Sequence, residues 1–140
     1  MRRIFADTFY WVALANPNDA HHDKAKDLSE KLQPFVIVTA DEVLGEFLGW
    51  LSKHGPKARQ MAVDLVDAIQ GNPNVRVMPQ TRNSFREGLD LYRSRLDKQY
   101  SLVDCVAMST MKQEGISEVL SNDKHFEQEG FTALFRQNSL

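Results

Sequence analysis

The chain has 140 residues, of which 42% are hydrophobic and 26% are charged, so we expect residues 1–140 to form one compact domain with a real core. Seventeen Lys and Arg residues face 19 Asp and Glu residues, for a net charge of −2. This balance excludes a basic domain that holds nucleic acid by bulk electrostatics alone. The single cysteine, Cys105, excludes an intrachain disulfide framework and a Cys-rich zinc site, and it favours a reducing compartment.

The N-terminal stretch superficially resembles a secretory signal, because two arginines precede a mainly apolar run over residues 4–15. Asp7 interrupts that run, and the Asn-Pro-Asn sequence at 16–18 ends it. No run approaches the roughly 20 apolar residues that a membrane span needs. We therefore expect a cytoplasmic protein.

Short β-rich runs alternate with longer segments of helical period. The β-rich runs cover residues 3–6, 35–38, 74–78, 118–121 and, more weakly, 132–134. Most connecting segments are long enough to hold a helix, a pattern typical of right-handed βαβ crossovers, which build a parallel sheet covered by helices on both faces. The sequence therefore predicts an α/β fold around a central parallel sheet.

Residues 81–98 are predicted to form a helix with two stripes of side chains. One stripe is apolar and contains Phe85, Leu89, Tyr92 and Leu96. A neighbouring stripe contains Arg82, Arg86 and Arg93. These arginines and Lys124 are candidates for contacts with the phosphates of a nucleic acid. A solvated helix face remains the alternative for the arginines.

Two acids lie at or just after the ends of predicted strands. Asp7 ends the first β-rich run, and Asp123 follows the run at 118–121 with only Asn122 between. Ligands of open parallel sheets bind at the carboxyl ends of the strands, so both acids are expected to face one crevice. Each also has a simpler interpretation: Asp7 could cap a helix, and Asn122 with Asp123 could make an ordinary Asx turn.

Two further acids lie on predicted helices. Asp104 lies in the first turn of a helix that Ser101 opens, and this pair also matches an S-x-x-D capping box. Glu46 lies at the edge of an apolar helical arc that contains Phe47 and Leu51, where a half-buried charge needs a partner. That partner could be a lysine or arginine of a neighbouring helix. The case for a shared site rests on the four acids together.

The segments around these acids resemble the PIN domain, in particular the VapC-like toxins of toxin–antitoxin pairs, over nearly the whole chain. The matching segments are Ile4-Phe5-Ala6-Asp7-Thr8, Val43-Leu44-Gly45-Glu46-Phe47-Leu48, Ser101-Leu102-Val103-Asp104-Cys105-Val106-Ala107 and Leu120-Ser121-Asn122-Asp123-Lys124-His125-Phe126. The last segment is the most specific. One departure is Ser121, where the family usually carries threonine, but the hydroxyl is retained.

The resemblance implies a three-layer α/β/α fold with strand order 3-2-1-4-5 and the activity of a metal-dependent endoribonuclease. It implies a toxin of the VapBC type, with RNA as substrate, a cognate antitoxin and a homodimer. The implied catalytic cluster is Asp7, Glu46, Asp104 and Asp123. The implied polar support is Thr8, Ser101 and Ser121.

Oxygen-only ligands select hard divalent cations, so this cluster favours Mg²⁺ or Mn²⁺ over zinc. We expect Asp7 and Asp104 to bind the cation directly, and Asp123 to bind it directly or through water. Glu46 is expected to orient the nucleophile as a base. The alternative function is a noncatalytic RNA-binding or protein-interaction module that keeps the fold.

Gly45 and Gly49 lie one helical turn apart and allow close approach of another backbone, either inside the fold or across a homodimer. Phe126 is expected to pack the turn between the fourth strand and the last helix. For the neighbouring His125, a catalytic or base-stacking role is left open.

Overall fold

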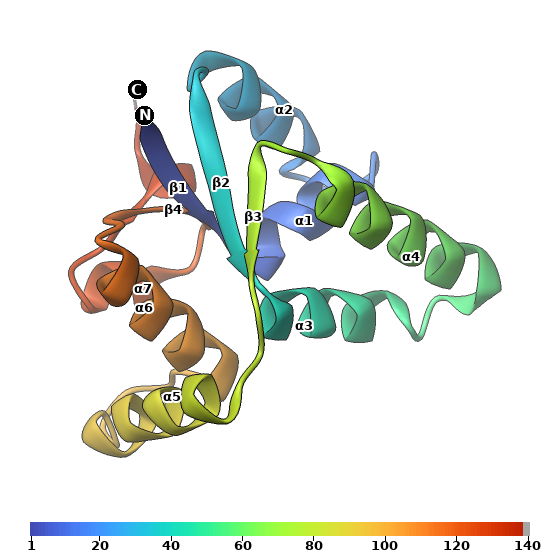
Figure 1. Ribbon diagram of the computed structural model, residues 1–140. Coiled ribbons are helices and arrows are strands. Elements are labelled where there is room, and N and C mark those ends of the chain that lie inside the picture. The colour runs from blue at the N-terminus through green and yellow to red at the C-terminus, as the bar shows by residue number, and fades with distance from the viewer. Residues whose placement is uncertain (139–140) are drawn as a thin grey trace.

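Five parallel strands form one sheet in the order β3-β2-β1-β4-β5 (Figure 1). The structure is a computed structural model and describes residues 1–138. The strands are β1 (Arg2–Ala6), β2 (Phe35–Ala40), β3 (Val75–Met78), β4 (Glu118–Leu120) and β5 (Thr132–Ala133). The predicted α/β fold and strand order are confirmed, and a strand lies at each of the predicted β-rich runs.

Helices cover both faces of the sheet, as the three-layer prediction requires. They are α1 (Thr8–Ala15), α2 (His22–Lys31), α3 (Asp41–Leu51), α4 (Gly55–Gly71), α5 (Arg82–Ser94), α6 (Leu102–Glu114), α7 (Lys124–Gln128) and the short 3₁₀ helix η1 (Leu134–Arg136). In Figure 1, α1, α2 and α4 lie on one side of the sheet and α5 and α6 on the other, whereas α3 extends from the carboxyl end of β2.

The core runs through the centre of the sheet. Ile4, Phe5 and Ala6 of β1 are all fully buried, because a central parallel strand is covered on both faces and therefore carries a continuous apolar run. Cys105 and Phe126 are fully buried as well, so Phe126 packs at its turn as predicted. The first strand is thus fixed on both faces, and so is the position where it ends.

Helix α5 differs from its prediction in length and in orientation. It ends at Ser94 instead of residue 98, and its buried residue is Gly88. A Cβ atom at Gly88 would lie 2.5 Å from Cγ2 of Val106 on α6, so the absence of a side chain is what allows the two helices to approach. The predicted apolar stripe therefore faces outward, with Phe85 40% exposed and Leu96 80% exposed.

The glycines of α3 face solvent. No atom lies within 4 Å of a Cβ built at Gly45 or at Gly49, and both residues are exposed. The first of the two predicted uses, close approach of a backbone inside the fold, is therefore wrong. The second use, contact across a homodimer, stays a prediction.

Candidate active site

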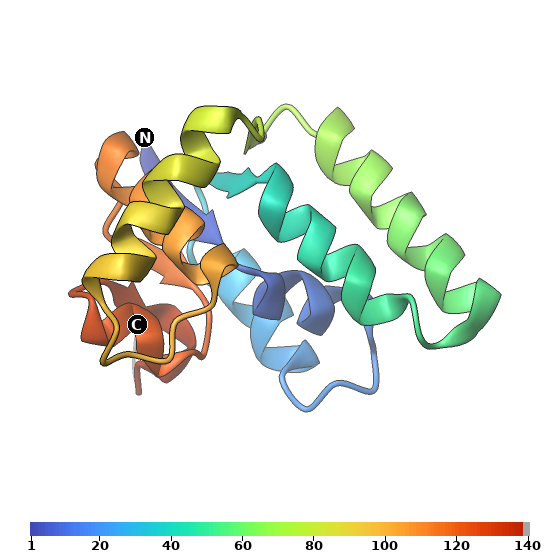
Figure 2. The same ribbon diagram turned by 90° about the horizontal axis from the view of Figure 1, so that it is seen from below.

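A cleft of about 520 Å³ opens at the carboxyl end of the sheet, beside the ends of β1 and β4. Figure 2 views the molecule from this end, with α1, α3 and α6 around its centre. The cleft is lined by all four predicted acids, Asp7, Glu46, Asp104 and Asp123. The structure thus brings together carboxylates from four different elements that are up to 116 positions apart in sequence.

Asp7 lies directly after β1 and directly before α1, and its side chain is almost fully buried, with 6% exposed. It occupies the cap position of α1 without a capping hydrogen bond from its side chain. The carboxylate accepts a hydrogen bond from the Ser121 hydroxyl instead, at 2.9 Å. Burial raises the pKa of Asp7 from 3.8 to about 7, and the charge of Asp104 acts in the same direction, against the Ser121 hydrogen bond. A charged Asp7 is therefore costly unless a cation lies nearby.

Ser121 connects two of the acids. Its hydroxyl, which is fully buried, donates to Oδ2 of Asp7 and accepts a hydrogen bond from the backbone N–H of Asp123 at 3.1 Å. The hydroxyl retained at position 121 therefore forms hydrogen bonds in the site. A second supporting hydroxyl, that of Thr8, is buried and donates to the backbone oxygen of Val43 on α3 at 3.4 Å.

Asp104 makes the predicted capping box and also faces the cleft. Oδ2 of Asp104 accepts a hydrogen bond from the backbone N–H of Ser101 at 3.0 Å, and the Ser101 hydroxyl accepts one from the N–H of Asp104. The other carboxylate oxygen, Oδ1, has no hydrogen-bond partner within residues 1–138. The capping role and a role in the cleft therefore use different oxygen atoms of one side chain.

Asp123 caps α7, and His125 joins it to Asp104. Oδ1 of Asp123 accepts a hydrogen bond from the backbone N–H of His125 at 2.9 Å. Nδ1 of His125 lies 3.1 Å from Oδ2 of Asp104 and 3.2 Å from Oδ1 of Asp123, and the imidazole packs against the ring of Tyr100. One ligand atom from each of the three residues lies within 4.8 Å of the other two. This oxygen-rich donor set fits a hard divalent cation.

The contacts of His125 with Asp104 and Asp123 are what sequence reasoning missed. The only indication was the position of His125 two residues after Asp123, in the turn that leads from the strand into a helix. Sequence alone does not show that this turn brings the ring between two carboxylates.

Glu46 is half-buried on α3 and lines the cleft. No hydrogen bond or ion pair from another side chain reaches it in the part of the chain that the structure describes. The lysine or arginine partner that was considered for it is therefore absent there. The structure leaves its carboxylate directed at the cleft.

The basic residues predicted to bind RNA do not line the cleft. Arg82 lies over the ring of Phe85 at 5.6 Å, Arg93 pairs with Asp90 at 3.5 Å, and Arg86 is exposed. Lys124 is exposed beside the cleft residue Asp123. Their contacts with RNA stay a prediction.

Comparison with known proteins identifies the family. The sequence pattern of the PIN domain matches residues 4–131. The chain belongs to the PIN domain family. Among curated relatives of this PIN domain, the 23S rRNA-specific endonuclease VapC20 of Mycobacterium tuberculosis is 33% identical over 132 residues, which span 94% of this chain and 97% of VapC20.

Solved structures show the same fold. The crystal structure of VapC20 from Mycobacterium tuberculosis, a toxin that cleaves the sarcin–ricin loop, superposes with a TM-score of 0.83 and 31% identity, covering 92% of this chain and 96% of VapC20. VapBC2 of Rickettsia felis, solved with a DNA fragment from its promoter, superposes with a TM-score of 0.64 and 13% identity, covering 94% and 96%. The predicted resemblance to VapC-like PIN domains is confirmed.

Proposed function

We propose that this PIN domain is a Mg²⁺- or Mn²⁺-dependent endoribonuclease, with residues 1–140 as one nuclease domain. The observation that carries this proposal is the convergence of Asp7, Glu46, Asp104 and Asp123 on one cleft. VapC20, which matches nearly the whole chain, is named an endonuclease. The predicted enzyme class, a nuclease that hydrolyses phosphodiester bonds, agrees with this homology.

We infer that Asp7, Asp104 and Asp123 hold the cation. When bound, a divalent cation lowers the pKa of a water molecule and stabilises negative charge that develops on a phosphate. The protein's own groups prepare this site: the Ser121 hydroxyl fixes the orientation of Asp7, and the backbone N–H of Ser101 fixes that of Asp104. These contacts hold the two carboxylates in fixed orientations, and a bound cation would relieve the repulsion between their charges.

Glu46 is proposed to orient the attacking water as a base, because its carboxylate faces the cleft without another side-chain partner. In-line attack on a phosphodiester by this water gives a 5′-phosphate and a 3′-hydroxyl. The attacking water loses its proton to the base, and the leaving 3′-oxygen takes up a proton from solvent.

We propose that RNA is the substrate and that the protein is the toxin of a VapBC-type pair, with a cognate antitoxin as partner. VapC20 is described as a toxin that cleaves the sarcin–ricin loop and as a 23S rRNA-specific endonuclease, and that substrate class is the first to test here. Within residues 1–138, no helix is both long and apolar enough to cross a membrane. A cytoplasmic location stays a prediction.

The homodimer is also a proposal. Two outward surfaces support it. One is the glycine face of α3, which offers room for close approach at Gly45 and Gly49. The other is an apolar surface formed by Tyr92 of α5, 45% exposed, and Leu96 just after the end of that helix, 80% exposed. Light scattering should give twice the mass of 16.0 kDa for the native chain and the single mass for Leu96→Asp. A native chain that remains monomeric at micromolar concentration would exclude this dimer.

The decisive experiment is cleavage of an end-labelled RNA that contains a sarcin–ricin loop, with Mg²⁺, with Mn²⁺ and with EDTA. We expect cleavage by the native chain only with a divalent cation. Asp7→Asn and Asp104→Asn should each reduce it at least 100-fold, by analogy with other essential catalytic groups at about 2.7 kcal/mol or more. An Asn variant that cleaves at the native rate refutes the metal site, and binding without cleavage by the native chain favours the noncatalytic module.

A further inference from the structure

Trp50 is a large aromatic side chain that the fold leaves on the surface. It is 61% exposed and lies on α3 one helical turn after Glu46, so the two side chains are neighbours on the same flank of the helix. Trp50 lines the cleft together with Phe9 and Val12 of α1. The cleft therefore has an apolar aromatic wall beside its carboxylates.

The same indole also borders a second, adjoining depression. This depression is lined by Glu46, Gly49, Trp50, Lys53 and His54, so Trp50 lies between the acidic cleft and a basic turn. Gly49 leaves open space beside the indole, because no atom lies within 4 Å of a Cβ built there.

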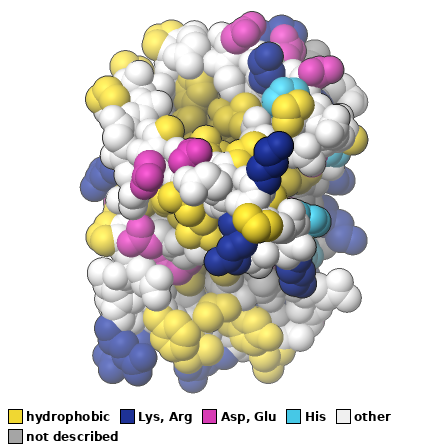
Figure 3. Space-filling view, turned by 90° about the vertical axis from the view of Figure 1, so that its right-hand side faces the viewer, with side chains coloured by type: hydrophobic (Ala, Val, Ile, Leu, Met, Phe, Trp, Pro, Cys, Tyr) yellow, Lys and Arg dark blue, Asp and Glu magenta, His cyan; other side chains and the backbone are white. Residues whose placement is uncertain are grey.

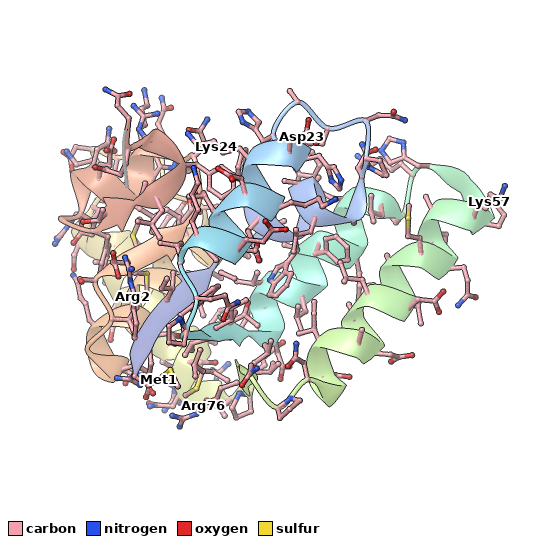
Figure 4. The ribbon with its side chains drawn as sticks, turned by 90° about the horizontal axis from the view of Figure 1, so that it is seen from above. Met1, Arg2, Asp23, Lys24, Lys57 and Arg76 are labelled. Atoms are coloured by element: carbon pink, nitrogen blue, oxygen red, sulfur yellow. The ribbon has the colours of Figure 1, made fainter. Side chains whose placement is uncertain are left out.

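The turn from α3 to α4 is basic. Lys53 and Lys57 are exposed, and neither forms an ion pair with any residue from 1 to 138. Figure 3, which faces this end of the molecule, shows Lys and Arg side chains next to hydrophobic ones and a histidine. Lys57 projects at the far end of the molecule from Met1 (Figure 4). These unpaired cations are available to an anionic ligand.

We propose that Trp50 is a stacking platform for a nucleobase next to the cleaved bond and that Lys53 binds the phosphate beyond that base. An RNA strand alternates bases with phosphates. The cleft offers carboxylates and then the aromatic face of Trp50, and the adjoining depression offers Lys53 just after the end of α3. The proposal rests on the proposed ribonuclease function and adds where the substrate strand runs. The ligand is a single-stranded segment or loop, because a base in a duplex offers no free face for stacking.

Charge balance supports this assignment. The chain carries a net charge of −2, and the cleft itself is acidic, so attraction to phosphates through the overall charge contributes little affinity, and phosphate binding depends on local cations such as Lys53. Stacking on an aromatic side chain does not depend on net charge and accepts any base. A nearly neutral nuclease therefore has a physical reason to hold RNA through an exposed indole.

The test measures binding of two labelled probes to full-length protein that carries Asp104→Asn, which should reduce cleavage at least 100-fold. One probe is a pentamer of uridylate, and the other is an abasic pentamer with the same number of phosphates. Trp50→Ala should weaken binding of the uridylate probe roughly 5- to 150-fold, the range for loss of one stacked base, and should leave binding of the abasic probe unchanged. Trp50→Phe should retain most of the affinity, because phenylalanine also stacks.

Two further variants test the path of the strand. Lys53→Ala should weaken both probes equally and reduce the slope of log affinity against log salt by about 0.7. Met61→Ala, which removes another exposed apolar side chain (42% exposed) on α4, is the matched control and should bind both probes like the parent protein. Thermal melting checks that each variant is folded.

The possible outcomes separate this inference from the proposed function. If Trp50→Ala weakens both probes equally or neither, the stacking platform is refuted, whereas RNA cleavage by the native chain still supports the nuclease. If Trp50→Ala binds RNA normally but dissociates a dimer in light scattering, Trp50 is a contact between copies and the inference is wrong. If the native chain neither binds nor cleaves RNA, both proposals are refuted.

Discussion

Replacing Asp7 by asparagine should stabilise the metal-free protein at neutral and alkaline pH. The carboxylate is buried beside Asp104, and its pKa is raised from 3.8 to about 7. At about 1.36 kcal/mol for each pKa unit, this penalty on the charged form is roughly 4 kcal/mol. Asparagine keeps an oxygen that can accept the Ser121 hydrogen bond and carries no charge, so Asp7→Asn should recover much of this free energy of unfolding.

The effect should depend on pH in one direction. Below about pH 4, Asp7 is protonated in both the folded and the unfolded chain, so it contributes no difference. Between about pH 4 and pH 7 the unfolded chain loses the proton first, so the free energy of unfolding of the native chain falls as pH rises, and above pH 7 the full penalty applies. The stability gain of Asp7→Asn should therefore be near zero at pH 4 and largest at pH 8.

Thermal melting in EDTA at pH 4, 6 and 8 measures this gain. For a chain of this size, 1 kcal/mol corresponds to roughly 3 °C in Tm, so Tm should rise by up to about 10 °C at pH 8. Asp67→Asn, which removes an exposed acid of α4, is the control and should change Tm by no more than about 2 °C. An Asp7→Asn variant that is no more stable than the native chain at pH 8 would refute the argument from buried charge.

Substitutions at three further positions test one contact beside the cleft and two contacts elsewhere in the fold. Ser121→Ala should lower RNA cleavage by roughly 10- to 100-fold, because Asp7 loses its buried donor, worth about 1–3 kcal/mol, and Ser121→Thr should restore cleavage in the same assay. Glu129→Gln should lower the free energy of unfolding by about 1–3 kcal/mol in urea at pH 7. A hydrogen bond from Arg95 holds the pKa of Glu129 at about 2. The difference in free energy of unfolding between the native chain and Glu129→Gln should therefore shrink as the pH falls from 4.5 toward 2. Gly88→Ala should cost about 1–3 kcal/mol in the same urea assay, because its new Cβ would meet Val106; equal stability would contradict the close packing of α5 on α6.

The fold was predictable because its determinants are local. Each strand is a short run rich in apolar or β-branched residues, and several turns between elements carry proline, glycine or asparagine. Parallel strands need crossover connections, and these connections are long enough for helices. The order of the strands came from the family resemblance, because periodicity does not determine which strands are neighbours.

The outward direction of the α5 stripe could not be predicted from periodicity. An apolar stripe ordinarily faces the core, but Gly88 lets the neighbouring flank pack against α6 at a shorter distance. A single missing side chain thus changes which flank of the helix faces the fold.

The sequence predicted which acids line the cleft, but it did not predict all of the residues that surround them. Asp7 and Asp123 follow strands, and that position alone predicts that they share one edge of the sheet. The contact of His125 with Asp104 joins residues of two helices, and the apolar wall beside Trp50 needs α1 opposite α3. Both depend on packing that one sequence does not display. The chemical roles of these residues stay predictions.

The two oxygens of Asp104 couple the start of α6 to the chemistry of the cleft. Replacement by alanine would remove the capping acceptor together with the carboxylate that faces the cleft, so lost cleavage in that variant could reflect a frayed helix. Asparagine retains an acceptor for the N–H of Ser101. Hydrogen exchange of the first-turn amides of α6 would separate the two effects, with protection kept in Asp104→Asn and lost in Asp104→Ala. In this protein, the integrity of a helix end and the reactivity of a site thus depend on one side chain.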